Sequence, residues 1–278
     1  MESIRTALLQ ELHQYGDDEM HPTLLAVIEH YIHRPAQYFR ARLLQDAARI
    51  YTSAPLTPAV ERLMVGVELL HLFALIHDDW LDREEHPHRP PAEATGEALL
   101  LAGDIVHAMG MEVIHHTVSS YGLHREIARI VAQAARITIS GQMRELHQDA
   151  APRSREELYQ LYDQKTGFYT AVAPLQTGAL AVAGPLDHVI HEDLPVLQAL
   201  GLIIGRAYQL RDDLMDLTED SRTLQLLRGE NGTKEIETRV HEWLIDLEAE
   251  AAPWIIQSNY PQELAELVHR SLGKERVG

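Results

Sequence analysis

The sequence predicts an all-α protein, folded as one domain over residues 1–278. Apolar residues recur at the spacing of one helix face along most of the chain, and no stretch alternates as a half-buried strand does. Proline, glycine and charged clusters interrupt this spacing at a few places. We therefore expect roughly eight to eleven helices around one core, for which a hydrophobic content of 45% is ample.

The helices can be placed in chain order from these positions. Apolar residues with helical spacing are Leu8, Leu9 and Leu12; Leu43, Leu44 and Ala47; Leu63, Val67, Leu70 and Phe73; and Ile127, Ile130, Val131 and Ala134. The breaks are expected at 53–60, 83–96, 149–157, 183–195 and 228–235. The third set belongs to a helix that begins near Pro58, directly after the first of these breaks.

Composition excludes several classes of function. Lys and Arg total 24 against 42 for Asp and Glu, and the formal net charge of −18 argues against nucleic acid or an anionic membrane surface as the main partner. The absence of cysteine excludes disulfides, thiolate catalysis and cysteine-based metal sites. The N-terminus lacks an apolar signal core, and Gln176 and two prolines interrupt the most apolar later run, 171–186. We expect a soluble, cytoplasmic protein without an integral membrane segment.

Two acidic motifs share one spacing, D-D-x-x-D. Their residues are Asp78, Asp79 and Asp82, and Asp212, Asp213 and Asp216. On a helix the first and fifth positions lie on one face, with their carboxylates about 6 Å apart. Crowded carboxylates repel one another and are costly to desolvate, so a cation is expected to compensate them.

A hard cation such as Mg²⁺ suits these oxygen-only ligands, because it binds a few carboxylates together with phosphate oxygens and water. The simpler alternative is a pair of acidic helix surfaces exposed to solvent. Each motif, however, follows an apolar helical run, "VELLHLFALIH" in one case and "LGLIIGRAYQL" in the other. This repetition favours a metal site formed by two facing helices.

From about residue 40 to residue 227, the chain resembles the trans-isoprenyl diphosphate synthase (polyprenyl synthetase) family, whose signature is two such motifs. The resemblance implies an isoprenoid synthase fold, a terpene synthase-like helical bundle, and a homodimer. It also implies roughly three Mg²⁺ ions that hold the diphosphate of an allylic substrate. The implied reaction is a prenyl transfer in which the allylic carbocation alkylates isopentenyl diphosphate.

Other family positions can be matched one at a time. "DQKTGFYTA" contains the family's K-T element, "SGQMREL" resembles its G-Q-x-x-D, and a glutamine precedes the second motif. The resemblance implies that the allylic diphosphate side of the site comprises Lys165, Thr166, Gln142, Glu145, Gln209 and Arg89. It places His71 near isopentenyl diphosphate, and "LLAGD" around Asp104 is also typical of the family.

The expected site for the second diphosphate departs from the family pattern. The family's G-K-x-x-R element corresponds to "YFRAR", in which Phe39 replaces the lysine, Arg40 follows it and Arg42 fits the arginine. The arginine pair expected after the first motif is reduced to Arg89 within "HPHRPP". About a dozen residues, including a lysine, are missing beyond the second motif. Each lost charge-assisted contact would cost roughly 1.5 to 3 kcal/mol.

These departures leave three hypotheses open. The first is a synthase that condenses an allylic diphosphate with isopentenyl diphosphate. The second is a class I terpene synthase that ionises one allylic diphosphate and cyclises or quenches the cation. The third, and the least favoured because both motifs are intact, is a noncatalytic subunit of a heteromeric prenyl synthase.

Product length is expected to depend on side chains beneath the first motif. Phe73 and Ala74 precede Asp78 by little more than one helical turn. In the family an aromatic residue there closes the cavity for the growing chain. The resemblance therefore implies a product of about three or four isoprene units, C15 to C20. Tyr169 is expected to face the developing positive charge.

Overall fold

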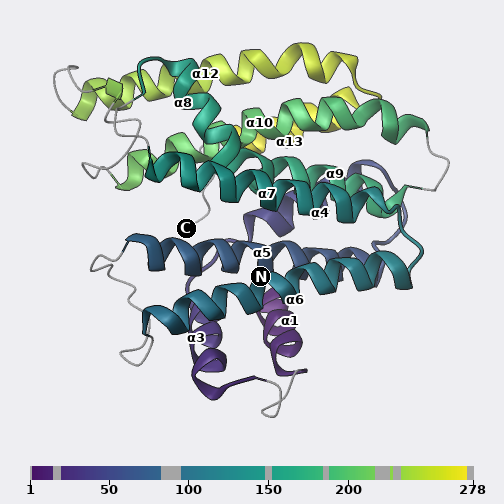
Figure 1. Ribbon diagram of the computed structural model, residues 1–278. Coiled ribbons are helices and arrows are strands. Elements are labelled where there is room, and N and C mark those ends of the chain that lie inside the picture. The colour runs from purple at the N-terminus through teal and green to yellow at the C-terminus, as the bar shows by residue number, and fades with distance from the viewer. Residues whose placement is uncertain are drawn as a thin grey trace.

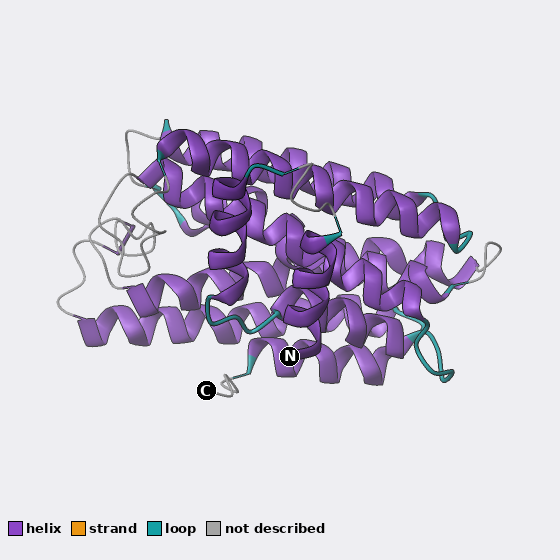
Figure 2. Ribbon diagram, turned by 90° about the horizontal axis from the view of Figure 1, so that it is seen from below, coloured by secondary structure: helices purple, strands orange, loops and turns teal. Residues whose placement is uncertain are grey.

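The computed structural model describes residues 2–14, 20–82, 95–147, 152–183, 188–216, 226–227 and 233–273. These residues form helices and connecting turns, with no strand among them (Figure 2). The all-α prediction is confirmed. If the uninterrupted helical run 155–182 is counted once, the number of helices in the described part of the chain lies within the expected range.

The helices follow one another in the order shown in Figure 1. They are α1 (Glu2–His13), α3 (Pro22–His33), α4 (Phe39–Ile50), α5 (Pro58–Asp82), α6 (Gly96–Ser120), α7 (Glu126–Leu146), α8 (Arg155–Tyr162), η1 (Asp163–Val172), α9 (Ala173–Val182), α10 (His188–Asp216), α12 (Thr233–Gln257) and α13 (Pro261–Leu272). One predicted break is shorter than expected, because α10 already begins at His188 and contains Pro195. Burial of Val196, Leu197 and Leu200 offsets the backbone hydrogen bond that this proline removes.

Helices α5 and α6 form a long antiparallel pair on one side of the bundle (Figure 1). Gly66 of α5 lies against Ile114 of α6, and His77 near the end of α5 lies against Gly103. By length and composition α6 alone among the described helices could cross a membrane, but half of its apolar window is buried in the bundle. This burial is typical of a core helix.

The run α8–η1–α9 contains a π-helical segment, η1, in its middle. Ser154 begins the run by accepting a hydrogen bond of 3.2 Å from the backbone N–H of Glu157. A Cβ atom on Gly205 of α10 would lie only 2.5 Å from Cα of Gly167, so η1 and α10 are in backbone contact. This contact brings the K-T element beside the helix that carries the second acidic motif.

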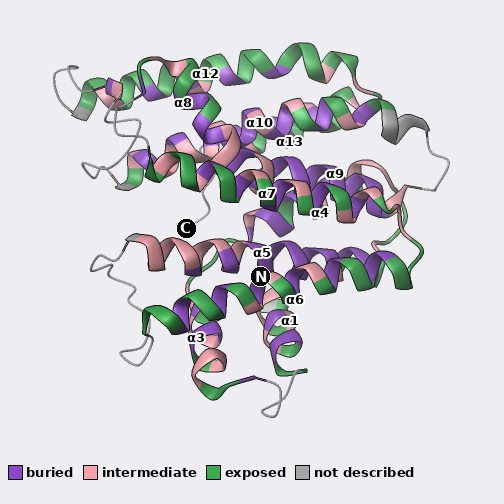
Figure 3. Cartoon of the chain, in the orientation of Figure 1, coloured by how far each residue is buried: buried purple, intermediate pink, exposed green. Residues whose placement is uncertain are grey.

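The core lies between these layers, and buried side chains concentrate on α5, α9 and the inward faces of α4, α7 and α10 (Figure 3). The outer face of α12 is largely exposed (Figure 3). Helix α3 packs against α5 and α6, which places Tyr31 and Arg34 next to the first acidic motif. The bundle thus surrounds the ends of α5 and α10, where the two motifs are located.

Candidate active site

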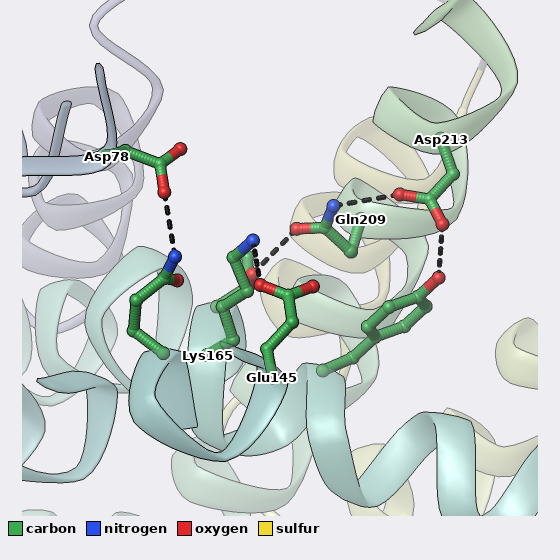
Figure 4. A network of polar contacts seen from close by, with 8 residues as sticks. Asp78, Glu145, Lys165, Gln209 and Asp213 are labelled. Atoms are coloured by element: carbon green, nitrogen blue, oxygen red, sulfur yellow. Dashed lines mark hydrogen bonds and ion pairs between the residues drawn. The ribbon is translucent and has the colours of Figure 1, made fainter. Parts of the chain in front are cut away.

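Asp78 of the first motif is held from the opposite side of the bundle by α7. Gln142 donates a hydrogen bond of 2.9 Å from Nε2 to Oδ1 of Asp78 (Figure 4). The charge of Asp78 also acts on the ammonium group of Lys165. The structure therefore brings together Asp78, Gln142 and Lys165, which come from three separate helices.

Asp79, in contrast, is bound to α3. Its Oδ2 atom accepts a 2.7 Å hydrogen bond from the hydroxyl of Tyr31 and lies 2.9 Å from Nη2 of Arg34. Burial, followed by the hydrogen bond to Asp79, raises the pKa of Tyr31 far above its ordinary value. The guanidinium of Arg34 lies over the Tyr31 ring, 4.3 Å from its centroid. Tyr31 and Arg34 carry no sequence signal that would have linked them to the motif.

In the second motif, Asp213 is buried and accepts two hydrogen bonds. Gln209, one turn earlier on α10, donates 2.9 Å from Nε2 to Oδ1, and Tyr162 donates its hydroxyl proton to Oδ2. Thr166 of η1 donates to Oε1 of Gln209 over 2.7 Å (Figure 4). Gln209 therefore orients Asp213 and is itself oriented by the K-T element. Sequence reasoning missed Tyr162, because the end of α8, "LYQLY", contains two tyrosines among leucines and resembles ordinary core packing.

Lys165 occupies the space between the two motifs (Figure 4). Its Nζ atom lies 2.5 Å from Oε2 of Glu145, the residue found where the family has aspartate. Burial opposes the charge on Lys165, but Glu145 and Asp78 outweigh it and hold the pKa above its ordinary value. Lys165 is therefore protonated at neutral pH and available to an anion that displaces Glu145.

The donor chemistry of the site fits a hard cation. The acidic groups of both motifs are carboxylates, whose oxygen atoms are the donors that a hard cation such as Mg²⁺ prefers. Within the described residues, no group of three or more histidine, aspartate or glutamate side chains already stands close enough together to hold a metal. The side chains of Asp82 and Asp216 lie outside the described set, as does the whole of Arg89. Their assignments remain predictions.

The half of the site expected to hold the second diphosphate contains a buried arginine. Arg40 is 3% exposed, and its Nη2 atom donates a 2.9 Å hydrogen bond to Thr170. Its guanidinium lies 4.5 Å from the centroid of the Tyr169 ring and 5.9 Å from that of Tyr208. Burial opposes its charge, but the two tyrosines and Glu68 hold its pKa above the ordinary value. Arg40 thus interacts mainly with the protein interior.

The residues near Arg40 differ in charge and exposure. Phe39, which replaces the expected lysine, packs against Tyr208 with ring centroids 5.1 Å apart. Arg42 is exposed on α4. Burial, followed by the charge of Arg40, lowers the pKa of His71 well below its ordinary value, so the imidazole is neutral at pH 7. Aromatic rings and a neutral histidine therefore occupy much of this half of the site.

A narrow apolar cavity lies below the motifs. Its walls include Val67, Leu70, Phe73 and Ala74 of α5, Thr138 of α7 and Tyr169 of η1. Its volume of about 20 Å³ is room for little more than one water molecule. Phe73 and Ala74, the predicted chain-length residues, thus line one cavity together with Tyr169.

Comparison with known proteins identifies the family to which this arrangement belongs. Residues 21–231 match the family model described as Polyprenyl synthetase. The chain belongs to the polyprenyl synthetase family. The resemblance inferred from the aspartate motifs is thereby confirmed, and it covers both motifs and the K-T element.

Individual members of the polyprenyl synthetase family share limited identity with this chain. The (2E,6E)-farnesyl diphosphate synthase of Mycobacterium tuberculosis is 37% identical over 161 residues, which are 55% of this chain and 42% of that protein. The geranylfarnesyl diphosphate synthase of Natronomonas pharaonis is 27% identical over 237 residues, 77% of this chain and 67% of that protein. This chain therefore spans less than half of the mycobacterial relative that it matches.

Solved structures show the same fold. The geranylgeranyl pyrophosphate synthase of Corynebacterium glutamicum, crystallised with isoprenyl diphosphate and magnesium, superposes with a TM-score of 0.76 over 98% of this chain and 96% of that one, at 19% identity. A geranyltranstransferase from Methanosarcina mazei gives a TM-score of 0.72 over 96% and 93% at 17% identity. The predicted isoprenoid synthase fold is confirmed.

Proposed function

We propose that this chain is a magnesium-dependent trans-prenyltransferase that condenses an allylic diphosphate with isopentenyl diphosphate. The product would be a short-chain polyprenyl diphosphate of about C15 to C20. One observation carries the proposal. Lys165 lies beside Asp78 of the first motif, while its neighbour Thr166 is linked through Gln209 to Asp213 of the second. The names of the relatives, farnesyl and geranylfarnesyl diphosphate synthases, support the same reaction class.

The motif aspartates divide into two groups in this proposal. Asp79 and Asp213 accept hydrogen bonds from the tyrosine hydroxyls of Tyr31 and Tyr162, whereas Asp78 accepts one from the amide of Gln142. Asp78, Asp82, Asp212 and Asp216 would hold the Mg²⁺ ions. The bound ions would neutralise the diphosphate and make it a better leaving group.

Lys165 would act on the same diphosphate. An incoming phosphate oxygen would replace Oε2 of Glu145 as the partner of the ammonium group, since both are anionic acceptors at one position. When the C–O bond of the substrate breaks, both electrons leave with the diphosphate and the allylic carbon becomes a cation. Lys165 is then placed to stabilise the charge that develops on the leaving group.

The cavity marks the place where the cation and the prenyl tail would lie, and its lining side chains would have to move apart to admit the tail, because its volume is only about 20 Å³. Its walls are apolar, which excludes water from the reacting carbon. The Tyr169 ring provides a π-face toward the positive charge. The double bond of isopentenyl diphosphate would then form the new C–C bond, and loss of a proton would restore an allylic diphosphate.

A class I terpene synthase is the second candidate, and one observation favours it. Arg40, a candidate cation for the second diphosphate, is buried and donates to Thr170. Phe39 packs on Tyr208 where the family has a lysine. An enzyme that ionises a single allylic diphosphate would not need these cations.

A noncatalytic subunit is the least supported of the three hypotheses. Such a subunit has no need to keep Lys165 between two intact motifs, or to keep the hydrogen bonds that orient Asp78 and Asp213.

We also propose that the chain forms a homodimer through α6 and α7. These helices contact each other and expose large apolar side chains, which a second copy would cover. They are Leu100 and Leu101 of α6, Tyr121 directly after α6, and Ile139, Met143 and Leu146 of α7. Met143, the most exposed of these at 58%, is the residue to change. Light scattering should give twice the chain mass for the native protein and the single mass for Met143→Asp; a monomeric native protein would refute the dimer.

The reaction is tested by product identification. Purified protein and Mg²⁺ are incubated with dimethylallyl, geranyl, farnesyl or geranylgeranyl diphosphate, each with and without isopentenyl diphosphate. Longer diphosphates that form only with isopentenyl diphosphate would establish the synthase. Hydrocarbons or alcohols formed from one allylic diphosphate alone would establish the terpene synthase, and no turnover of any substrate would refute both.

A further inference from the structure

Phe73 lines the apolar cavity and also contacts two histidine rings that do not line it. The ring centroids of Phe73 and His77 are 4.9 Å apart at an interplanar angle of 72°. Those of Phe73 and His107 are also 4.9 Å apart, at 63°. Both are edge-to-face contacts, which fix the orientation of an aromatic ring. Of the described residues that line the cavity, Phe73 is one and the two histidines are not.

His77 is fixed by α6 and can act as a firm support. Its Nε2 atom lies 3.0 Å from the carbonyl oxygen of Leu100; because a carbonyl only accepts hydrogen bonds, Nε2 carries the proton. A Cβ atom on Gly103 would lie 2.2 Å from Cδ2 of His77. The imidazole of His77 therefore occupies space beside α6 that any residue larger than glycine at position 103 would fill.

His107 lies one turn beyond Gly103 on α6 and is the second ring in edge contact with Phe73. Burial lowers the pKa of His107, which keeps the ring neutral beside the aromatic edge. Phe73 thus contacts both the cavity and the two imidazole rings, which do not line the cavity. If either imidazole were removed, the Phe73 ring could rotate toward α6 and lengthen the cavity.

We infer that His107 is a specificity-determining positioning residue, which limits the length of the prenyl chain by holding Phe73 against the apolar cavity. This inference rests on the proposed function, because it concerns the chain that the cavity would accept. His107 is the better test residue than His77, since His77 directly precedes Asp78 and its loss would disturb the first motif.

Each variant is incubated with Mg²⁺, isopentenyl diphosphate and dimethylallyl, geranyl, farnesyl or geranylgeranyl diphosphate. The experiment compares the longest product that each variant forms, or, if no elongation occurs, the longest allylic diphosphate that it consumes. His107→Ala should shift that limit upward by one isoprene unit or more, with overall turnover within about threefold of the native enzyme. His107→Phe keeps a ring at this place and should restore the native length. His115→Ala, an exposed histidine of the same helix, is the matched control and should change nothing.

A double variant separates positioning from a merely structural effect. If His107 acts through Phe73, Phe73→Ala/His107→Ala should give the same chain length as Phe73→Ala alone. An unchanged length in His107→Ala, together with a longer product in Phe73→Ala, would overturn this inference and leave the proposed function intact. A native enzyme that consumes none of the four diphosphates would overturn both.

Discussion

Gln142 of α7 donates a 2.9 Å hydrogen bond to Asp78 of α5, and so fixes one carboxylate oxygen of the first motif. If Asp78 binds Mg²⁺ as proposed, Gln142 is a partner of a metal ligand, and such partners contribute about 10- to 100-fold to metal affinity. In Gln142→Leu we expect the Mg²⁺ concentration for half-maximal rate to rise by about that factor. Rates measured against Mg²⁺ at saturating allylic substrate test this.

Gln133→Leu on the same helix should leave the Mg²⁺ dependence unchanged, because Gln133 is bonded to Arg129 and not to an acidic motif. A native Mg²⁺ curve in Gln142→Leu would mean that this hydrogen bond does not orient a metal ligand.

Removal of the Asp78 carboxylate should abolish most of the activity without unfolding the protein. Turnover in Asp78→Ala, and equally in Asp212→Ala, should fall by about 100- to 1,000-fold, because charge stabilisation on the leaving group is lost. The melting temperature should not fall, since an acidic residue in the last turns of a helix opposes the helix dipole. Glu61→Ala, in the exposed first turn of α5, is the control. Nearly native turnover in either aspartate variant would remove the metal assignment.

Loss of Arg40 should destabilise the fold in a pH-dependent way. Burial raises the pKa of Glu68, and the charge of Arg40 lowers it. In Arg40→Met the buried carboxylate loses its cation, so the variant should lose about 3 to 5 kcal/mol at pH 7 to 8. Because the pKa of Glu68 is raised in the folded state, the folded protein binds a proton at Glu68 at a higher pH than the unfolded chain does. Part of the lost stability should therefore be recovered as the pH falls toward the ordinary pKa of glutamate.

Urea unfolding at several pH values measures this loss. Arg42 is exposed, and its charge is the smallest of the influences on the pKa of Glu68, so Arg42→Met should change stability by less than about 0.5 kcal/mol at every pH. An equal, pH-independent loss in the two variants would contradict the pairing of Arg40 with Glu68.

His71 should make folding stability sensitive to mild acid. Burial and Arg40 lower its folded-state pKa, so the unfolded chain binds a proton at His71 near pH 6.5 while the folded protein does not. Its contribution is fully present above about pH 6.5 and is lost as the pH falls, by up to about 1.4 kcal/mol per pH unit. His71→Gln should therefore lose less stability than the native protein between pH 7 and 5. Parallel curves would show that His71 titrates normally.

The fold could be predicted from the sequence because helical periodicity reflects local burial. Leu63, Val67 and Leu70 share one face of a helix regardless of which helix covers them, and all three are buried in α5. The π-helical turn of η1 could not be predicted in this way. This segment lies against α10 where Gly167 and Gly205 approach closely, and such a contact between segments far apart in the sequence leaves no local periodicity.

The site could be predicted in part. The motifs indicated Asp78, Lys165 and Gln209 as members of one site, and the structure brings their helices together. The D-D-x-x-D spacing does not say which carboxylate turns toward the protein, and so the link from Asp79 to Tyr31 was missed. The role of Arg40 toward a second diphosphate stays a prediction, whereas its contacts with Thr170 and Tyr169 depend on packing between α4 and η1 and could not be predicted.

The π-helical segment also constrains how this chain can vary in length. Each residue of an α-helix advances the helix by about 100°, so deletion of one residue within Asp163–Val172 would rotate everything on one side by that angle. Lys165 could then face the aspartates only if Gly178 turned away from Leu44, where a Cβ atom would lie 2.1 Å from the carbonyl oxygen. Insertions and deletions should therefore be tolerated in the surface connections but not within Asp163–Val172. We expect related chains to keep the same number of residues in this segment.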